Sequence, residues 1–182
     1  MDGGALMNQC IHNIDLLRWM MGNDVTEVIG LTDNLQHGYL EAEDFGAALI
    51  QFANGSYGIV EGTTAIYPEN LEETLYIFGE KGTAKAGGKS VNRIEEWRFA
   101  DSIESTQEIK KWCREEPPNI YGFGHKLLYK DMMEAVRDDR QPYVSAADGR
   151  RALELVLAIY KSQKIGNAVT LPLKHFSTLD MK

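Results

Sequence analysis

Between residues 25 and 99 the chain is a series of short runs in which apolar and polar residues alternate, and this pattern restricts the fold more than any other feature. Asn54-Gly55, between the second and third runs, is a strong signal for a tight hairpin turn. Most connections are too short for a parallel crossover, which takes about a dozen residues or more, so antiparallel pairing is expected. The expected strands are Val25–Leu31, Asp44–Phe52, Tyr57–Ile66, Leu71–Phe78, Thr83–Ala86 and Val91–Phe99.

Helices are expected on both sides of this strand region. Apolar residues at helical spacing predict helices over Ala5–Met21, Gly122–Arg137 and Ala146–Ile165, followed by a short strand over Val169–Leu173. Strands gathered together with helices to one side indicate an α+β fold, with a largely antiparallel open sheet and helices packed on one face. We expect one domain over residues 1–182. No glycine-rich turn of the dinucleotide-binding type joins a strand to a helix, so no Rossmann domain is expected in the chain.

Composition narrows the classes of protein to which the chain can belong. The formal net charge of −8 would repel a phosphate backbone, which argues against a nucleic-acid partner. Two cysteines, Cys10 and Cys113, form neither a disulfide framework nor a zinc ligand set and are typical of a protein of the reducing cytoplasm. No apolar run approaches the roughly 20 residues that cross a bilayer, so no membrane partner is expected.

The first expected helix carries functional side chains beside its apolar face. Asn8, His12, Asp15 and Trp19 follow one another at spacings of four, three and four residues, which places them on one side of a regular helix. The amide, the imidazole and the carboxylate are therefore expected to face one small volume. The solvent-facing side of a helix also carries polar residues that have no function, and spacing alone favours that interpretation.

A histidine beside a carboxylate suits proton transfer, because the imidazole titrates near neutral pH and the carboxylate orients the ring. Oxidation of a secondary alcohol by hydride transfer needs a base for the hydroxyl proton, and His12 is the candidate. His125 opens the second helix and is either a ligand-facing residue or an ordinary surface histidine. A metal-dependent hydrolase that uses His12 and Asp15 is a weaker alternative, since no second local ligand pair accompanies them, and no metal site is predicted.

The segment from Gly3 to Gly22, GGALMNQCIHNIDLLRWMMG, resembles the opening of the C-terminal domain of the Gfo/Idh/MocA oxidoreductases. The pattern of that family is roughly G-G-G-x-L-x-D/N-x-G-x-H-x-x-D-x-x-x-W-x-x-G, and Cys10 stands where it usually has glycine. Later segments are similar to the family in the expected order. They are the hairpin within Asp44–Ile59, the stretch Leu75–Ala86, and the closing helix and strand over Ser145–Leu173.

The resemblance implies a domain like the C-terminal domain of glyceraldehyde-3-phosphate dehydrogenase, whose sheet often forms the subunit interface. It implies NAD or NADP in the full-length protein, bound by an N-terminal Rossmann domain that also supplies a catalytic lysine. Asn8 and His12 match the positions that face substrate and nicotinamide, and Asp15 and His125 are further substrate-binding candidates. An asparagine at position 8 resembles the branch that acts on UDP-linked amino sugars or their uronates, typically at the 3-position, whereas aspartate is common in polyol oxidisers.

The expected function is that of the substrate and oligomerisation domain of an NAD(P)-dependent oxidoreductase, acting on a sugar or nucleotide-sugar hydroxyl. The chain is then a fragment of a longer enzyme, with no bound cofactor and no dehydrogenase activity of its own. Self-association through a sheet face is expected, because Tyr76 and Phe78 alternate with Leu75 and Ile77, so both faces of that strand carry apolar groups. The alternative is a non-catalytic module that binds sugar or dimerises.

Overall fold

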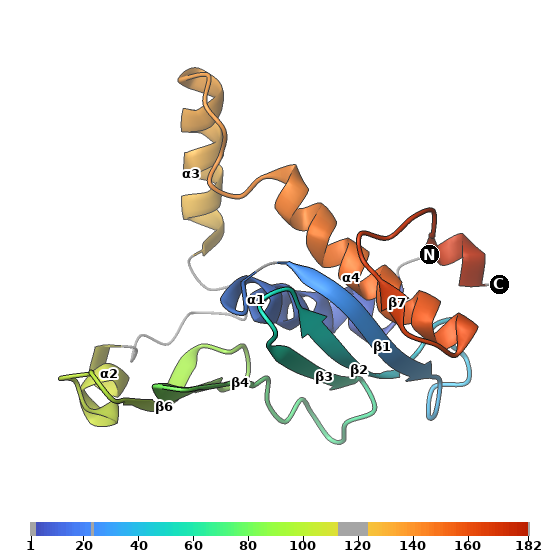
Figure 1. Ribbon diagram of the computed structural model, residues 1–182, viewed down its shortest axis with the longest axis horizontal. Helices are drawn as coiled ribbons and strands as arrows, with labels where there is room; N and C mark the ends of the chain where they lie inside the picture. The colour runs from blue at the N-terminus through green and yellow to red at the C-terminus, as the bar shows by residue number, and fades with distance from the viewer. Residues whose placement is uncertain (1–2, 23, 113–123, 182) are drawn as a thin grey trace. The chain divides into compact units, whose positions relative to one another are not determined.

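The computed structural model describes residues 3–22, 24–112 and 124–181 (Figure 1). The chain forms two compact units, one made of Met1–Tyr67 with Ala146–Lys182 and the other of Pro68–Ser145. Every strand pair among the described residues is antiparallel, so the predicted α+β class and the antiparallel pairing are confirmed. None of the helices among these residues is long and apolar enough to span a membrane.

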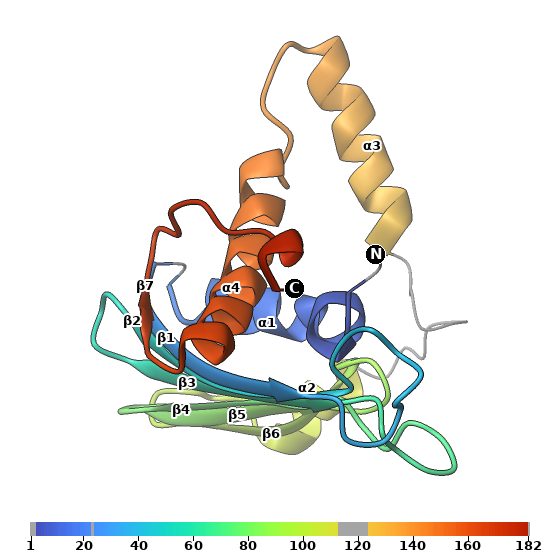
Figure 2. The same ribbon diagram turned by 90° about the vertical axis from the view of Figure 1, so that its right-hand side faces the viewer.

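The first unit is a four-stranded sheet with helices on one face. Its strands are β1 (Val25–Asp33), β2 (Phe45–Phe52), β3 (Tyr57–Thr63) and β7 (Val169–Thr170), in the order β3-β2-β1-β7. Its helical segments are η1 (Leu6–Cys10), α1 (Ile11–Met20), α4 (Ala146–Ile165) and η2 (Thr178–Met181). Figure 2 shows α1 and α4 on the same side of β1, β2 and β3. The predicted arrangement of helices on one face of an open sheet therefore holds in this unit.

The covered face of the four-stranded sheet is built from small and apolar residues that lie in register across three strands. The cross-strand rows are Val28–Ile50–Gly58, Gly30–Ala48–Val60 and Thr32–Gly46–Gly62. A Cβ atom at Gly46 would lie 2.5 Å from Cδ1 of Leu6, and one at Gly62 would collide with Sγ of Cys10. These two glycines let the first helix approach the sheet closely. That approach fixes the height of the helix, and of its outer side chains, above the sheet.

The second unit contains a three-stranded sheet. Its elements are β4 (Leu75–Gly79), β5 (Gly82–Gly87), β6 (Arg93–Phe99), α2 (Thr106–Trp112) and α3 (Gly124–Arg137), and the strand order is β4-β5-β6. Lys85 of β5 pairs with Glu95 of β6 at 2.5 Å and lies over the ring of Tyr76 in β4, with Nζ 5.0 Å from the ring centroid. Ion pairing with Glu95 is the main reason that the pKa of Lys85 is raised. The three side chains thus connect all three strands of this small sheet.

Five strands are shorter than expected, since β2 begins at Phe45, β3 ends at Thr63 and β4 begins at Leu75, while β6 and β7 are shortened for local reasons. β7 ends at Thr170 rather than Leu173, because Pro172 has no N–H with which to extend the ladder. The N–H of Leu171 still donates to the carbonyl of Thr26 at 3.0 Å. β6 begins at Arg93 rather than Val91, because Val91 has a φ of 50° and lies in the left-handed region, outside strand geometry.

The loop between β1 and β2 folds around the buried carboxylate of Asp44. Its oxygens accept hydrogen bonds from the backbone N–H groups of Leu35, Gln36 and His37, each at 2.8 Å, and Nδ1 of His37 lies 2.9 Å from Oδ2. The backbone donors, that of Leu35 above all, lower the pKa of Asp44 to about 2 against the opposing effect of burial. The carboxylate therefore organises the loop only while it is ionised.

We expect acid to destabilise the protein through Asp44. Because its pKa falls from 3.8 to about 2 on folding, its stabilising contribution is complete above about pH 4 and is lost as the pH falls toward 2. Urea unfolding at about pH 6 and about pH 2.5 measures this, with Asp44→Asn as the comparison. The free energy of unfolding of the wild type should fall by more than that of the variant, and equal falls would contradict the assignment.

Candidate functional site

The segment that carries the candidate site residues is a helix in two parts. η1 is a single π-helical turn over Leu6–Cys10, and the regular α-helix α1 follows over Ile11–Met20. The expectation of one regular helix over Ala5–Met21 is therefore corrected in its first turn, which contains Asn8. Single π-helical turns inside helices are often found at functional sites, because they change the direction of the side chains they carry.

The start of this helix is tied to Glu43, which lies in the loop between β1 and β2, two residues before β2 begins. The backbone carbonyl of Glu43 accepts the N–H of Ala5, and its Oε1 accepts the N–H of Leu6, both at 2.9 Å. The same Oε1 accepts the hydroxyl of Tyr160 in α4 at 2.8 Å. A Cβ atom at Gly4 would collide with the Glu43 carboxylate, so only glycine fits there. Glu43 thus satisfies two helix-start N–H groups and fixes the position at which the turn with Asn8 begins.

The polar side of the helix faces outward. Asn8 and His12 are exposed, Asp15 is half-buried, and the side chain of Trp19 is 57% exposed. The opposite side packs against the sheet through its buried residues Leu6, Ile14 and Leu17. Asn8, His12 and Asp15 therefore lie along the outer side of one helical segment, where a ligand has access to all three.

Asp15 pairs with Arg18 rather than orienting His12. Nη2 and Nε of Arg18 lie 2.7 and 3.1 Å from Oδ1 of Asp15. Among the described residues the imidazole of His12 makes no hydrogen bond or ion pair, so the expected contact between Asp15 and His12 is not formed. Arg18, three residues further along the helix, is buried and offers Asp15 a full charge with two donors, which favours the Arg18–Asp15 pair.

His125 lies in the second unit, at the beginning of α3. Its side chain is exposed, and its ring centroid is 6.5 Å from that of Tyr129, one turn further along the same helix, with 29° between the ring planes. Asn8, His12 and Asp15 belong to the first unit, so the geometry that brings these three together does not include His125.

Comparison with known proteins decides the family. Residues 1–171 match the family model GFO_IDH_MocA_C, described as the C-terminal alpha/beta domain of an oxidoreductase family. The chain belongs to the Gfo/Idh/MocA oxidoreductases. The resemblance predicted from the Gly3–Gly22 segment is confirmed.

Solved relatives add detail to this assignment. The WlbA dehydrogenase of Bordetella pertussis, crystallised with NADH and UDP-GlcNAcA, is 40% identical with a TM-score of 0.85, over 95% of this chain and 49% of its own. The WlbA dehydrogenase of Chromobacterium violaceum, in complex with the same two molecules, is 36% identical with a TM-score of 0.82, over 95% and 47%. The curated myo-inositol 2-dehydrogenase of Thermotoga maritima is 26% identical over 93% and 49%. This Gfo/Idh/MocA domain spans about half the length of the relatives it matches.

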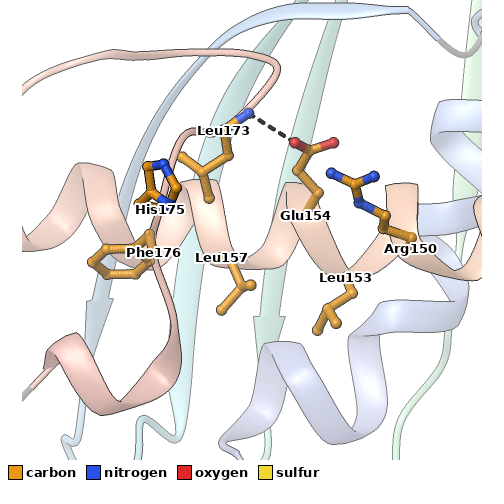
Figure 3. Close-up of a pocket in the computed structure, with 7 residues that line it drawn as sticks. All are labelled: Arg150, Leu153, Glu154, Leu157, Leu173, His175 and Phe176. Atoms are coloured by element: carbon orange, nitrogen blue, oxygen red, sulfur yellow. Dashed lines mark hydrogen bonds between the residues drawn. The ribbon is translucent and has the colours of Figure 1, made fainter.

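A pocket of about 230 Å³ lies elsewhere on the first unit of the Gfo/Idh/MocA domain (Figure 3). It lies between α4 and the segment after β7, where Oε1 of Glu154 accepts the N–H of Leu173 at 2.7 Å. The lining residues are Arg150, Leu153, Glu154, Leu157, Leu173, His175 and Phe176. Because Asn8, His12 and Asp15 are not among them, this pocket is separate from the candidate site.

The metal alternative finds no support in the part of the chain that the structure describes. No group of three or more His, Cys, Asp or Glu side chains is arranged there to hold a metal ion. Since Asp15 is already engaged by Arg18, His12 and Asp15 do not form the ligand pair that a hydrolase of this kind needs.

Sequence reasoning missed three residues that shape the site. Arg18 could have been found from its three-residue spacing to Asp15, which favours an ion pair on a helix. Glu43 and Tyr160 are separated by 117 residues, and no local pattern connects them to each other or to the first helix. Burial, together with the hydrogen bond to the Glu43 carboxylate, raises the pKa of Tyr160, so its hydroxyl remains a donor.

Replacing Glu43 by alanine is expected to destabilise the Gfo/Idh/MocA domain by about 2–4 kcal/mol, because the N–H of Leu6 and the buried hydroxyl of Tyr160 both lose their acceptor. Glu43→Gln is the matched control, since its amide oxygen still accepts both hydrogen bonds. Urea unfolding measures the difference between the two variants. Equal stability of the alanine and glutamine variants would show that Glu43 does not anchor the helix.

Proposed function

We propose that this domain is the substrate-side half of an NAD-dependent dehydrogenase that oxidises a sugar hydroxyl of UDP-GlcNAcA or of a closely related nucleotide uronate. The observation that carries the proposal is the 40% and 36% identity, over nearly the whole chain, to two WlbA dehydrogenases crystallised with NADH and UDP-GlcNAcA. Identity to the myo-inositol enzyme is lower, at 26%. Asn8 favours the same choice, because it stands where polyol oxidisers commonly have aspartate.

The chemistry assigned to this domain is removal of the hydroxyl proton. Alcohol oxidation breaks the O–H and C–H bonds of one secondary carbinol, releases a proton and a hydride, and leaves a ketone. When bound, NAD supplies the hydride acceptor. The described strands contain no parallel βαβ unit that would hold a dinucleotide. We therefore assign to this domain the side chains that act on the reacting hydroxyl of the sugar. His12 fits the role of the base, since its exposed imidazole is not engaged by any described residue.

Asn8 and Asp15 are proposed to orient the sugar. Oδ1 of Asn8 accepts a hydrogen bond from Nε2 of Gln9 at 2.9 Å, which leaves Nδ2 to donate to a substrate oxygen. Asp15 offers a carboxylate oxygen to a sugar hydroxyl. His125 is proposed as a further substrate-binding residue because it opens α3 and its side chain is exposed. With His12, Asn8 and Asp15 would fix the hydroxyl that reacts.

Initial rates of NAD reduction by the full-length protein test the substrate class. UDP-GlcNAcA should give turnover, UDP-GlcNAc should give much less because it lacks the carboxylate, and myo-inositol should give none. Turnover with myo-inositol and none with the nucleotide sugars would overturn the proposal. Tight binding of UDP-GlcNAcA without turnover would instead favour the alternative of a non-catalytic sugar-binding module.

Self-association is the second part of the proposal, through the uncovered face of the four-stranded sheet. Ile29, Leu49 and Ile59 lie in register across β1, β2 and β3 on this face, and Leu31 and Tyr57 flank the row. All five side chains are exposed, Ile59 to 80%. An apolar row of this extent is typical of a surface that packs against another protein, and a second copy would cover it with the same row.

A cytoplasmic location is proposed from the cysteine content. The sequence holds two cysteines, and Sγ of Cys10 lies against Gly62 in the first unit. So small a number of cysteines is typical of a protein of a reducing compartment, in which NAD-dependent metabolism also takes place.

A further inference from the structure

Arg18 is a charged residue in an unusual position. Its side chain is only 4% exposed, yet it belongs to α1, the helix that carries His12. Burial of a guanidinium is costly unless hydrogen bonds and an opposite charge compensate it. Part of that compensation comes from Asp15, whose own side chain is 45% exposed.

The ion pair between Arg18 and Asp15 uses one of the two carboxylate oxygens of Asp15, which matters for substrate binding. Two donors of Arg18, Nε and Nη2, contact the same carboxylate oxygen of Asp15, Oδ1, at 3.1 and 2.7 Å. Among the described residues, no partner contacts Oδ2. Two donors on one oxygen restrict rotation of the carboxylate about χ2, while the second oxygen remains available to a ligand on the open side of the helix.

We infer that Arg18 is a positioning residue for the proposed reaction, which holds Asp15 so that Oδ2 accepts a hydrogen bond from a substrate hydroxyl. The inference rests on the proposed function and deepens it. Arg18 itself is buried beneath the polar side of the helix and does not touch the substrate. It acts on the substrate through Asp15.

The charge of Arg18 has a second consequence for the substrate class. UDP-GlcNAcA carries phosphates and a carboxylate, and the chain already has a net charge of −8. An unpaired Asp15 would repel such a substrate, whereas the Arg18–Asp15 pair offers a hydrogen-bond acceptor without net charge. Loss of Arg18 should therefore weaken binding of a nucleotide uronate more than it slows the chemical step.

A purely structural role predicts something different. If Arg18 only stabilised the helix, its replacement would lower activity by the same factor whether or not position 15 carries a carboxylate. A double-mutant cycle with Arg18→Met and Asp15→Asn in the full-length enzyme separates the two roles. The double variant leaves no unpaired charge in the buried part of the helix, so it keeps the test informative if Arg18→Met alone folds poorly.

The experiment measures kcat and KM for UDP-GlcNAcA with saturating NAD in the wild type, both single variants and the double variant, with Arg18→Lys as the conservative variant. Arg18→Met should lower kcat/KM by about tenfold, mainly through a higher KM, and by less than about twofold when Asp15→Asn is already present. Arg18→Lys should recover part of the loss, because lysine keeps the charge and one donor.

An equal loss from Arg18→Met in both backgrounds would overturn the inference, as would no loss in either. His12→Ala, measured beside these variants, distinguishes this failure from failure of the proposed function. If His12→Ala loses turnover while the cycle is additive, only the role of Arg18 is wrong. If His12→Ala keeps full turnover, the proposed function fails whatever the cycle shows.

Discussion

Replacing His12 by alanine in the full-length enzyme is expected to lower kcat by about 10²–10⁴-fold, the usual contribution of a positioned general base. The side chain is exposed and makes no hydrogen bond within the described residues, so its truncation removes little packing. The melting temperature should therefore remain close to that of the wild type. A loss in kcat, with KM nearly unchanged, would place His12 in the chemical step rather than in binding.

His175→Ala is the matched control for this prediction. His175 is also an exposed histidine of the first unit, but it lies after β7 and lines the pocket beside α4, away from the first helix. Its replacement should leave kcat within about twofold of the wild type, since it has no place in the proposed proton transfer. If His12→Ala and His175→Ala lowered kcat by the same factor, His12 would not be the general base.

Placing a charge on the uncovered sheet face is expected to dissociate the proposed dimer. Ile59→Lys puts an ammonium group into the apolar row formed with Leu49 and Ile29, where a partner copy would have to bury it. We expect the dissociation constant to rise by about thirtyfold or more, which corresponds to a central interface residue. Because Ile59 is 80% exposed in the single chain, the fold itself should tolerate the change.

Light scattering at tens of micromolar measures this effect on the 182-residue chain. Leu153→Lys is the control, since Leu153 is also an exposed aliphatic residue but lies on α4, the helix that covers the opposite face of the sheet. The wild type and the control should show at least the mass of a dimer, and Ile59→Lys the mass of a monomer. A monomeric wild type would contradict self-association outright.

The parts of the fold that were predictable are those set by local sequence. α4 begins at Ala146 and ends at Ile165, as its apolar periodicity indicates, because a long amphipathic helix repeats its signal over many turns. The hairpin at Asn54-Gly55 was also predictable, since Gly55 has a φ of 85°, which few other residues adopt without strain. α2, at Thr106–Trp112, is not among the three helices expected from the sequence, because its segment is short and mostly polar.

The candidate site was predictable only in part. Spacing placed Asn8, His12 and Asp15 on one outer side of a helix, and their exposure agrees with that placement. It could not show that the first turn is π-helical, because that turn begins where Glu43 accepts the N–H of Leu6 across 37 residues of sequence. Nor could spacing choose between His12 and Arg18 as the partner of Asp15. That choice follows from burial, which depends on the packing of the helix on the sheet.

The most direct test of the central claim compares NAD reduction in the presence of UDP-GlcNAcA by two proteins. One is residues 1–182 alone, and the other is the full-length protein, in which we propose that this domain is joined to a nucleotide-binding domain. We predict NADH formation by the full-length protein and none above background by the domain alone, because the described strands of the domain form no parallel βαβ unit that would hold the hydride acceptor. Normal turnover by the isolated domain, or none by the full-length protein, would contradict the account.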